Sequence, residues 1–296
     1  MMAGAAAASD VLSVAGRLAH VDTTDAELIR DGANTLYRLP HGIVARIGRA
    51  GTAHIARREL RVARWLANVG VPAIQPVAIP AQPHLVRDRP VTWWELLPPH
   101  RVATPSELGA VLNALHRLAV PSELDLPFYD PFVGIDHAML ADAVGIEPAD
   151  RDWLVRRFDD LRERYRQADY ASSRCVLHGD AWQGNIAVTE TGRVIVLDLE
   201  RFAIGPPEWD LVQLAVDYTD FARLGTGDYQ AFVSTYGGYD VTGAPRYRLL
   251  ADIQEFRWVC FTLSKTATRP EAIQETRHRI HCLRGDVPRP WTWTAL

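Results

Sequence analysis

The chain has 296 residues, which is enough for one large domain or for two lobes that each have a hydrophobic core. Hydrophobic residues make up 48% and charged residues 23%, as in ordinary globular proteins, and a net charge of −4 gives no basic field for nucleic acid and no acidic tail. Lys265 is the only lysine, so arginine must fill any role that usually falls to lysine.

Cysteine usage and the apolar segments predict a cytoplasmic protein. The three cysteines are odd in number and lack the spacing of a disulfide framework, so they are expected to be reduced thiols. The alanine-rich start lacks a basic region and is interrupted by Asp10, which argues against a signal peptide. No apolar run reaches the roughly 18 residues needed to cross a bilayer. We therefore expect no nucleic-acid or membrane partner, and the oligomeric state is left open.

The first third of the chain predicts β-strands around one helix. Apolar residues alternate or run together in three segments, and Pro40-His41-Gly42 forms a hairpin turn between the first two. The predicted helix opens at Thr52 and ends at Gly70. The predicted strands cover 34–39, 43–47 and 90–96.

Beyond Pro98 the pattern becomes mainly helical. Thr104 and Glu107 have the spacing of a capping box, with Pro105 at the first helical position. The other predicted segments are helices over 153–165, 246–265 and 270–284 and a short β region over 175–197. Strands around one helix, followed by a helical bulk with a β insert, predict a two-lobed α+β enzyme.

Three polar residues in the β insert suit phosphoryl transfer. A carboxylate must orient the attacking hydroxyl and accept its proton, and Asp180 fits that role. Mg²⁺ prefers hard oxygen ligands, which Asn185 and Asp198 provide. The alternative interpretation is a polar turn whose Asp and Asn only cap backbone groups.

These motifs resemble the aminoglycoside phosphotransferase and choline kinase-like family of small-molecule kinases. His178-Gly179-Asp180 with Asn185 resembles the family's catalytic loop, Asp198-Leu199-Glu200 its metal-binding motif, and residues 205–211 the segment that follows it. The resemblance extends more loosely from about residue 34 to 285. It implies a protein-kinase-like fold, with a small β-rich nucleotide-binding lobe and a larger, mainly helical catalytic and acceptor-binding lobe. The predicted domains are residues 1–97 and 98–296.

The resemblance also implies a nucleotide site in the first lobe. Arg46 stands where the family usually has a phosphate-binding lysine, and Glu59 would be its ion-pair partner. The alternative is a surface arginine and a solvated helix glutamate. The backbone C=O of Trp94 and N–H of Leu96 would bond the adenine edge, although a buried strand end is a competing interpretation.

The acceptor is expected to be small. The segment from Leu199 to Gly205 is too short for the peptide-docking activation segment of a protein kinase. Trp182 and Glu200 are candidates to contact the substrate, and each has a scaffolding alternative. Four carboxylates in the helical part could meet a cationic or polyhydroxylated ligand or could be solvated helix charges; these are Asp217, Asp220, Asp252 and Glu255.

Besides an unrelated α+β protein whose motif is accidental, two hypotheses follow. The first is an ATP- and Mg²⁺-dependent phosphotransferase acting on a hydroxyl of a small molecule such as an aminoglycoside, an amino alcohol or a sugar, with GTP not excluded as donor. The second is a nucleotide-binding sensor or scaffold without turnover, which is motivated by arginine at position 46 and by the single glycine in the loop over 31–35.

Overall fold

The structure is a computed structural model that describes residues 2–168, 170 and 174–296. The chain divides into two compact units, one rich in β-structure and one mainly helical. The first unit comprises the chain up to Ala103 together with Pro121–Leu126 and Gln183–Phe202, and the second comprises Thr104–Val120, Pro127–Trp182 and Ala203–Leu296. The predicted α+β class is confirmed. The functional boundary near residue 98 stays a prediction.

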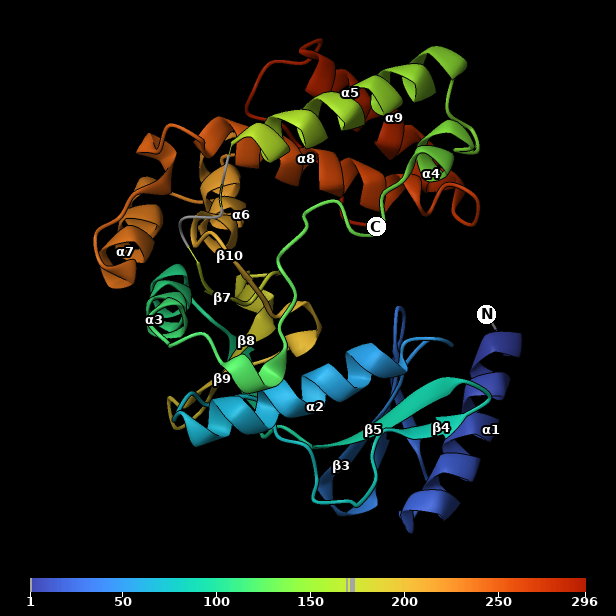
Figure 1. The fold of residues 1–296 in the computed structure, drawn as a ribbon. Helices are drawn as coiled ribbons and strands as arrows, with labels where there is room; N and C mark the ends of the chain where they lie inside the picture. Colours follow the sequence, from blue (N-terminus) through green and yellow to red (C-terminus); the bar gives the residue numbers. More distant parts are fainter. Residues whose placement is uncertain (1, 169, 171–173) are drawn as a thin grey trace. The chain divides into compact units, whose positions relative to one another are not determined.

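A five-stranded antiparallel sheet forms the centre of the first unit (Figure 1). Its strand order is β1-β2-β3-β5-β4. The strands are β1 (Glu27–Asp31), β2 (Thr35–Leu39), β3 (Ile43–Ile47), β4 (His84–Val86) and β5 (Arg89–Glu95). The predicted turn between β2 and β3 is a short 3-10 turn at Pro40–Gly42, in which Gly42 has a φ of 71° that glycine adopts at little cost.

The described residues of this unit form two α-helices, whereas the sequence predicted only one. Helix α1 (Met2–Ala19) packs Val11, Leu12 and Ala15 into the core formed by the sheet, as Figure 1 shows for the helix as a whole. Helix α2 (Ala53–Asn68) is the predicted one, and its buried residues recur every three or four positions. The prediction of a single helix was therefore wrong, because the alanine-rich start shows little contrast between polar and apolar faces.

A second, three-stranded sheet in the first unit carries two of the predicted site residues. Its order is β6-β8-β9, with strands β6 (His100–Val102), β8 (Ile186–Thr189) and β9 (Val194–Val196). Asn185 ends the 3-10 turn that leads into β8, and Asp198 precedes the 3-10 turn Leu199–Arg201 that follows β9. The predicted turn near Gly192 joins β8 to β9. In this turn the N–H of Gly192 donates to Thr189 O at 2.9 Å.

The second unit is mainly helical, and in it β7 (Cys175–Leu177) pairs with β10 (Ala203–Gly205). Its helices are α3 (Pro105–His116), α4 (His137–Ala141), α5 (Pro148–Gln167), α6 (Glu208–Thr219), α7 (Thr226–Tyr236), α8 (Tyr247–Leu263) and α9 (Pro270–Arg284). The predicted capping box is present at the start of α3, where Thr104 and Glu107 each bond the other's backbone N–H. Helices α3 and α7 approach closely, since a Cβ at Gly109 would lie 2.5 Å from Phe232 O.

None of the helices in the described part of the chain has both the length and the apolar character needed to cross a bilayer.

Candidate functional site

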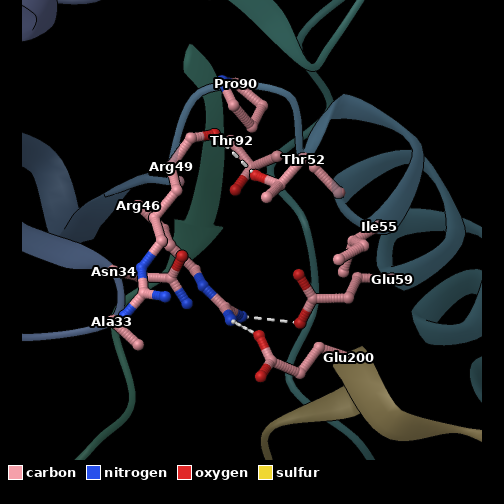
Figure 2. Close-up of a pocket in the computed structure, with 12 residues that line it drawn as sticks. Ala33, Asn34, Arg46, Arg49, Thr52, Ile55, Glu59, Pro90, Thr92 and Glu200 are labelled. Atoms are coloured by element: carbon pink, nitrogen blue, oxygen red, sulfur yellow. Dashed lines mark hydrogen bonds and ion pairs between the residues drawn. The ribbon is translucent and has the colours of Figure 1, made fainter. Parts of the chain in front are cut away.

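An arginine surrounded by carboxylates lies in the first unit (Figure 2). Side chains alternate along β3, so Ala45 and Ile47 enter the core beside α1 while Arg46 points to the opposite face. Arg46 Nη1 lies 2.6 Å from Glu59 Oε1, and Nη2 lies 2.9 Å from Glu200 Oε2. The side chains of Arg46 and Glu59 are only 16% and 4% exposed, which excludes the alternative of a surface arginine and a solvated glutamate.

Burial and charge shape the ionisation of this group. Burial is the main cause that raises the pKa of Glu59 to about 7; Arg46 opposes the shift, and the carboxylates of Glu200 and Asp198 add to it. Burial lowers the pKa of Arg46, but the neighbouring carboxylates outweigh that effect and raise it on balance. One guanidinium therefore faces three carboxylates, and the group attracts additional positive charge.

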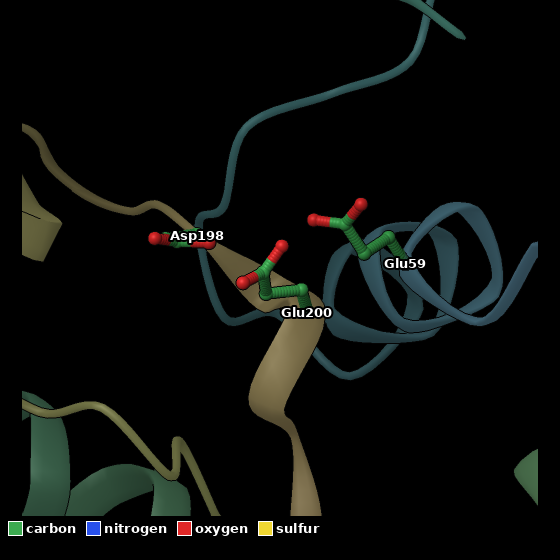
Figure 3. A group of neighbouring side chains, drawn as sticks. All are labelled: Glu59, Asp198 and Glu200. Atoms are coloured by element: carbon green, nitrogen blue, oxygen red, sulfur yellow. The ribbon is translucent and has the colours of Figure 1, made fainter. Parts of the chain in front are cut away.

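The three carboxylates also form a set of oxygen atoms that could hold a metal ion (Figure 3). Ligand atoms of Glu59, Asp198 and Glu200 all lie within 4.8 Å of one another. Asp198 Oδ1 is buried and accepts no hydrogen bond from the described residues, although Arg46 Nη2 lies 3.9 Å away. A buried carboxylate oxygen without a donor suits a hard cation, and so these residues fit Mg²⁺.

Backbone hydrogen bonds hold the two predicted metal ligands at the ends of neighbouring strands of one sheet. The N–H of Leu197 donates to Asn185 O at 2.9 Å, which ties the turn before β8 to the end of β9 next to Asp198. Asp198 has φ 52° and ψ 64°, in the left-handed region. Arg58 Nη2 donates to Glu200 O at 2.8 Å and fixes the turn that follows.

The catalytic-loop segment lies in the second unit, directly after β7. The carboxylate of Asp210, at the start of α6, accepts hydrogen bonds from the backbone N–H groups of His178 at 2.7 Å and Gly179 at 2.8 Å. Gly179 has a φ of 81°, a conformation that favours glycine. Its carbonyl oxygen accepts from Tyr129 Oη at 3.1 Å, so the loop that carries Asp180 is held on both sides.

The sequence predicted no site role for Asp210. It is 1% exposed and also contacts Nε2 of His116, at 3.1 Å, while Nδ1 of His116 lies 2.9 Å from Tyr236 Oη. A buried carboxylate with several donors is strongly positioned. The available signal was the resemblance of residues 205–211 to a family segment that ends in Asp-Leu, here Asp210-Leu211.

The predicted adenine contact at Leu96 needs correction. Its N–H donates to Gly42 O at 2.7 Å, because β5 continues its pairing with β3 into the turn at Gly42. That donor is therefore used inside the first unit. Trp94 is 3% exposed, and its indole N–H donates to Thr92 Oγ1 at 2.8 Å.

The substrate candidates have different environments. Trp182 is 46% exposed in the second unit, whereas Glu200 is in an ion pair with Arg46 in the first. The four carboxylates proposed to meet a cationic ligand are all engaged by arginines of the same unit. The ion pairs include Asp217–Arg223, Asp220–Arg248, Asp220–Arg289, Asp252–Arg248, Glu255–Arg248 and Glu255–Arg289. The structure thus uses these carboxylates internally.

Comparisons with known proteins agree with this arrangement. The profile of the APH phosphotransferase enzyme family matches residues 10–250. Among solved structures, the chain resembles the amicoumacin kinase hAmiN in complex with AMP-PNP, Ca²⁺ and Ami, with 15% identity, a TM-score of 0.71, and coverage of 94% of this chain and 93% of that chain. No curated protein matches the chain.

Two further solved structures are similar. Choline kinase LicA from Streptococcus pneumoniae is 14% identical with a TM-score of 0.63, and the match covers 91% of this chain and 97% of that chain. The GDP and kanamycin complex of APH(2")-IIia is 16% identical with a TM-score of 0.66, and the match covers 93% of this chain and 98% of that chain. These similarities confirm the predicted kinase-like fold.

Proposed function

Because the chain belongs to the APH phosphotransferase enzyme family, we propose that it transfers the terminal phosphoryl group of ATP to a hydroxyl of a small molecule. The observation that carries this proposal is the group formed by Arg46, Glu59 and Asp198 in the first unit. It combines a guanidinium with carboxylate oxygens that suit a divalent metal, and the bound metal would attract the phosphates. GTP is a possible second donor.

Asn185 and Asp198 would hold the metal ion in our proposal. Mg²⁺ bound there would neutralise phosphate charge and orient the nucleotide. Arg46, fixed by Glu59, adds positive charge to the nucleotide site. Trp94 lies near the end of β5 and Leu96 directly follows it, and we propose that the backbone C=O of Trp94 and the side chain of Leu96 contact the base, rather than the Leu96 N–H.

Asp180 is the proposed catalytic base. Its carboxylate would orient the acceptor hydroxyl and take its proton while the hydroxyl oxygen bonds to the γ-phosphorus and ADP leaves. The hydrogen bonds from His178 and Gly179 to Asp210 support this role, because they fix the backbone on which Asp180 stands. Positioning of this kind supplies much of the rate in phosphoryl transfer.

The acceptor in our proposal is a small hydroxylated molecule, in the class of aminoglycosides, amino alcohols or sugars. Relatives of the fold carry names such as amicoumacin kinase and choline kinase, and another was crystallised with kanamycin. Trp182 has the exposure that an acceptor contact requires, whereas Glu200 is better explained as a partner of Arg46. We propose that the enzyme works in the cytoplasm, where ATP is available.

The test measures ADP release with Mg²⁺-ATP against a panel of aminoglycosides, other hydroxylated antibiotics, amino alcohols and sugars. Asp180→Asn should abolish release while nucleotide binding persists, whereas Asp228→Asn, at an exposed aspartate of α7, should turn over like the wild type. Equal turnover by Asp180→Asn would remove Asp180 from the role of base. Nucleotide binding without turnover on any acceptor would favour the non-catalytic sensor or scaffold.

A further inference from the structure

Two arginines line the cavity next to the acidic group, and they differ in their surroundings. The cavity has a volume of about 150 Å³ and lies within the first unit. Arg46 is largely buried among carboxylates, whereas Arg49 is exposed. Figure 2 shows the Arg49 side chain along the side of the cavity away from Glu59 and Glu200.

Most of the hydrogen-bonding capacity of Arg46 is already used. A guanidinium has five N–H donors in a fixed planar arrangement. One reaches Glu59 from Nη1 and one reaches Glu200 from Nη2. With the Asn34 amide oriented so that its oxygen faces the guanidinium, that oxygen accepts from Nη2 at 2.6 Å and from Nε at 3.1 Å. Counting partners in the described part of the chain, four of the five donors are directed at protein groups.

The charge of Arg46 is also divided among its neighbours. Glu59, Asp198 and Glu200 all lie within 4.0 Å of its guanidinium. Because phosphate oxygens are anionic, a nucleotide polyphosphate would meet a net negative group here unless further positive charge is present. A bound divalent cation supplies part of that charge, and a second cationic side chain at the cavity would supply more.

Arg49 has the geometry for that role. Its backbone is fixed, since Arg49 O accepts from Thr52 Oγ1 at 2.7 Å and Gly48 N–H donates to Pro90 O at 2.8 Å. No ion pair joins its guanidinium to a carboxylate among residues 2–168, 170 and 174–296. Its guanidinium therefore remains available to donate two parallel hydrogen bonds to two phosphate oxygens, because its planar geometry matches that of a phosphate group.

We propose that Arg49 contacts the terminal phosphates of the bound nucleotide directly, while Arg46 sets the charge and geometry of the acidic group. This inference rests on the proposed function, because it requires the cavity to receive a nucleotide. It assigns the tasks of charge balance and phosphate contact to two different arginines, which lie at the end of β3 and just beyond it.

The experiment compares the equilibrium affinities of ATP, ADP, AMP and adenosine at one fixed concentration of Mg²⁺ and one ionic strength. The proteins are the wild type, Arg49→Gln, Arg49→Lys and a matched control, Arg57→Gln, which removes an exposed arginine of α2 that does not line the cavity. Arg49→Gln should lose about tenfold or more in affinity for ATP, leave adenosine affinity unchanged and unfold at the wild-type temperature. Arg49→Lys should lose less, and Arg57→Gln should match the wild type.

The possible failures are distinguishable. If Arg49→Gln prefers ATP over adenosine as strongly as the wild type does, the inference about Arg49 is overturned while the proposed function stands. If the wild type itself has no preference for ATP over adenosine, both the proposed function and this inference are overturned. An equal loss of ATP affinity in Arg57→Gln and Arg49→Gln would indicate long-range charge rather than contact, and would also overturn the inference.

Discussion

Asp210 Oδ2 accepts a hydrogen bond from the backbone N–H of His178 at 2.7 Å, and this bond joins the start of α6 to the loop after β7. The same carboxylate accepts from Gly179, so two consecutive N–H groups of the loop converge on one buried side chain. The position of Asp180 relative to the helical core of the second unit is thus set by a residue that has no proposed contact with substrate.

Asp210→Asn should therefore lower both stability and turnover. The amide keeps the volume, but it removes the negative charge and replaces one acceptor oxygen by a donor that faces N–H groups. We expect the free energy of unfolding to fall by about 3 kcal/mol, in the range for breaking a buried charged network. Urea denaturation measures this change. Asp142→Asn, at an exposed position, is the control, and an unchanged unfolding midpoint for Asp210→Asn would contradict the structural role.

Asp198→Asn should weaken binding of Mg²⁺-ATP without unfolding the protein. Asparagine tolerates the left-handed conformation that residue 198 adopts, so the turn is retained while the charge is lost. We expect a loss of roughly tenfold or more in affinity for Mg²⁺-ATP, since even residues that only support metal ligands contribute that much. Titration with Mg²⁺-ATP and a thermal melt separate the two effects, and unchanged affinity would sink the assignment of Asp198 as a ligand.

Thr104→Ala should destabilise α3 by about 1 kcal/mol, the usual cost of losing an N-cap. Thr104 Oγ1 accepts from the Glu107 N–H at 3.2 Å, and Glu107 Oε2 accepts from the Thr104 N–H at 2.8 Å. Because the two bonds form one reciprocal unit, the double variant with Glu107→Ala should lose less than the sum of the single losses. Chemical denaturation of all four proteins tests this, and strict additivity would show that the bonds act independently.

The contribution of Asp240 to stability should depend on pH. Burial raises the pKa of Asp240, but hydrogen bonds from Tyr229 and Thr242 outweigh it and bring the pKa below its usual 3.8. The unfolded chain therefore binds the proton more readily, so the stabilisation is present above the unfolded pKa and is lost as the pH falls through the folded pKa. Because solvent screens this exposed site, Asp240→Asn should cost no more than about 0.5 kcal/mol at pH 6 and progressively less below about pH 4. A cost that grew on acidification would contradict the sign.

Leu12→Ala should show that α1 is an integral part of the first unit. Leu12 is 2% exposed in the core, whereas Leu18 on the same helix is 56% exposed. We expect the first substitution to cost about 2–4 kcal/mol in unfolding free energy and the control Leu18→Ala no more than about 0.5 kcal/mol. Similar small effects for both would mean that α1 is only loosely attached.

Features with a local cause were predictable from the sequence. The capping box at Thr104, the turn at Gly42 and the helix that stops before Gly285 each follow from residue types within one or two turns of chain. The ion pair of Arg46 with Glu59 was also found, because the resemblance supplied the positions of both partners.

Features that depend on distant partners were not predictable in the same way. Helix α1 was missed because its alanine-rich sequence has little contrast between its faces until the sheet buries one of them. The sequence predicted that the Leu96 N–H bonds adenine, because no residue near Leu96 in the chain indicates that Gly42 O accepts its hydrogen bond. Likewise, the carboxylates of Asp220 and Glu255 were proposed for a ligand, whereas Arg289, far along the chain, bonds both.

The left-handed backbone at Asp198 implies a conflict between folding and function at one residue. A glycine there would adopt φ 52° without a Cβ clash, so Asp198→Gly would relieve local strain while it removed the proposed metal ligand. Screening variants for heat resistance alone would thus tend to enrich replacements that inactivate the protein at this position. An aspartate at this position is therefore better explained by the functional need for a carboxylate than by the stability of the turn that contains it.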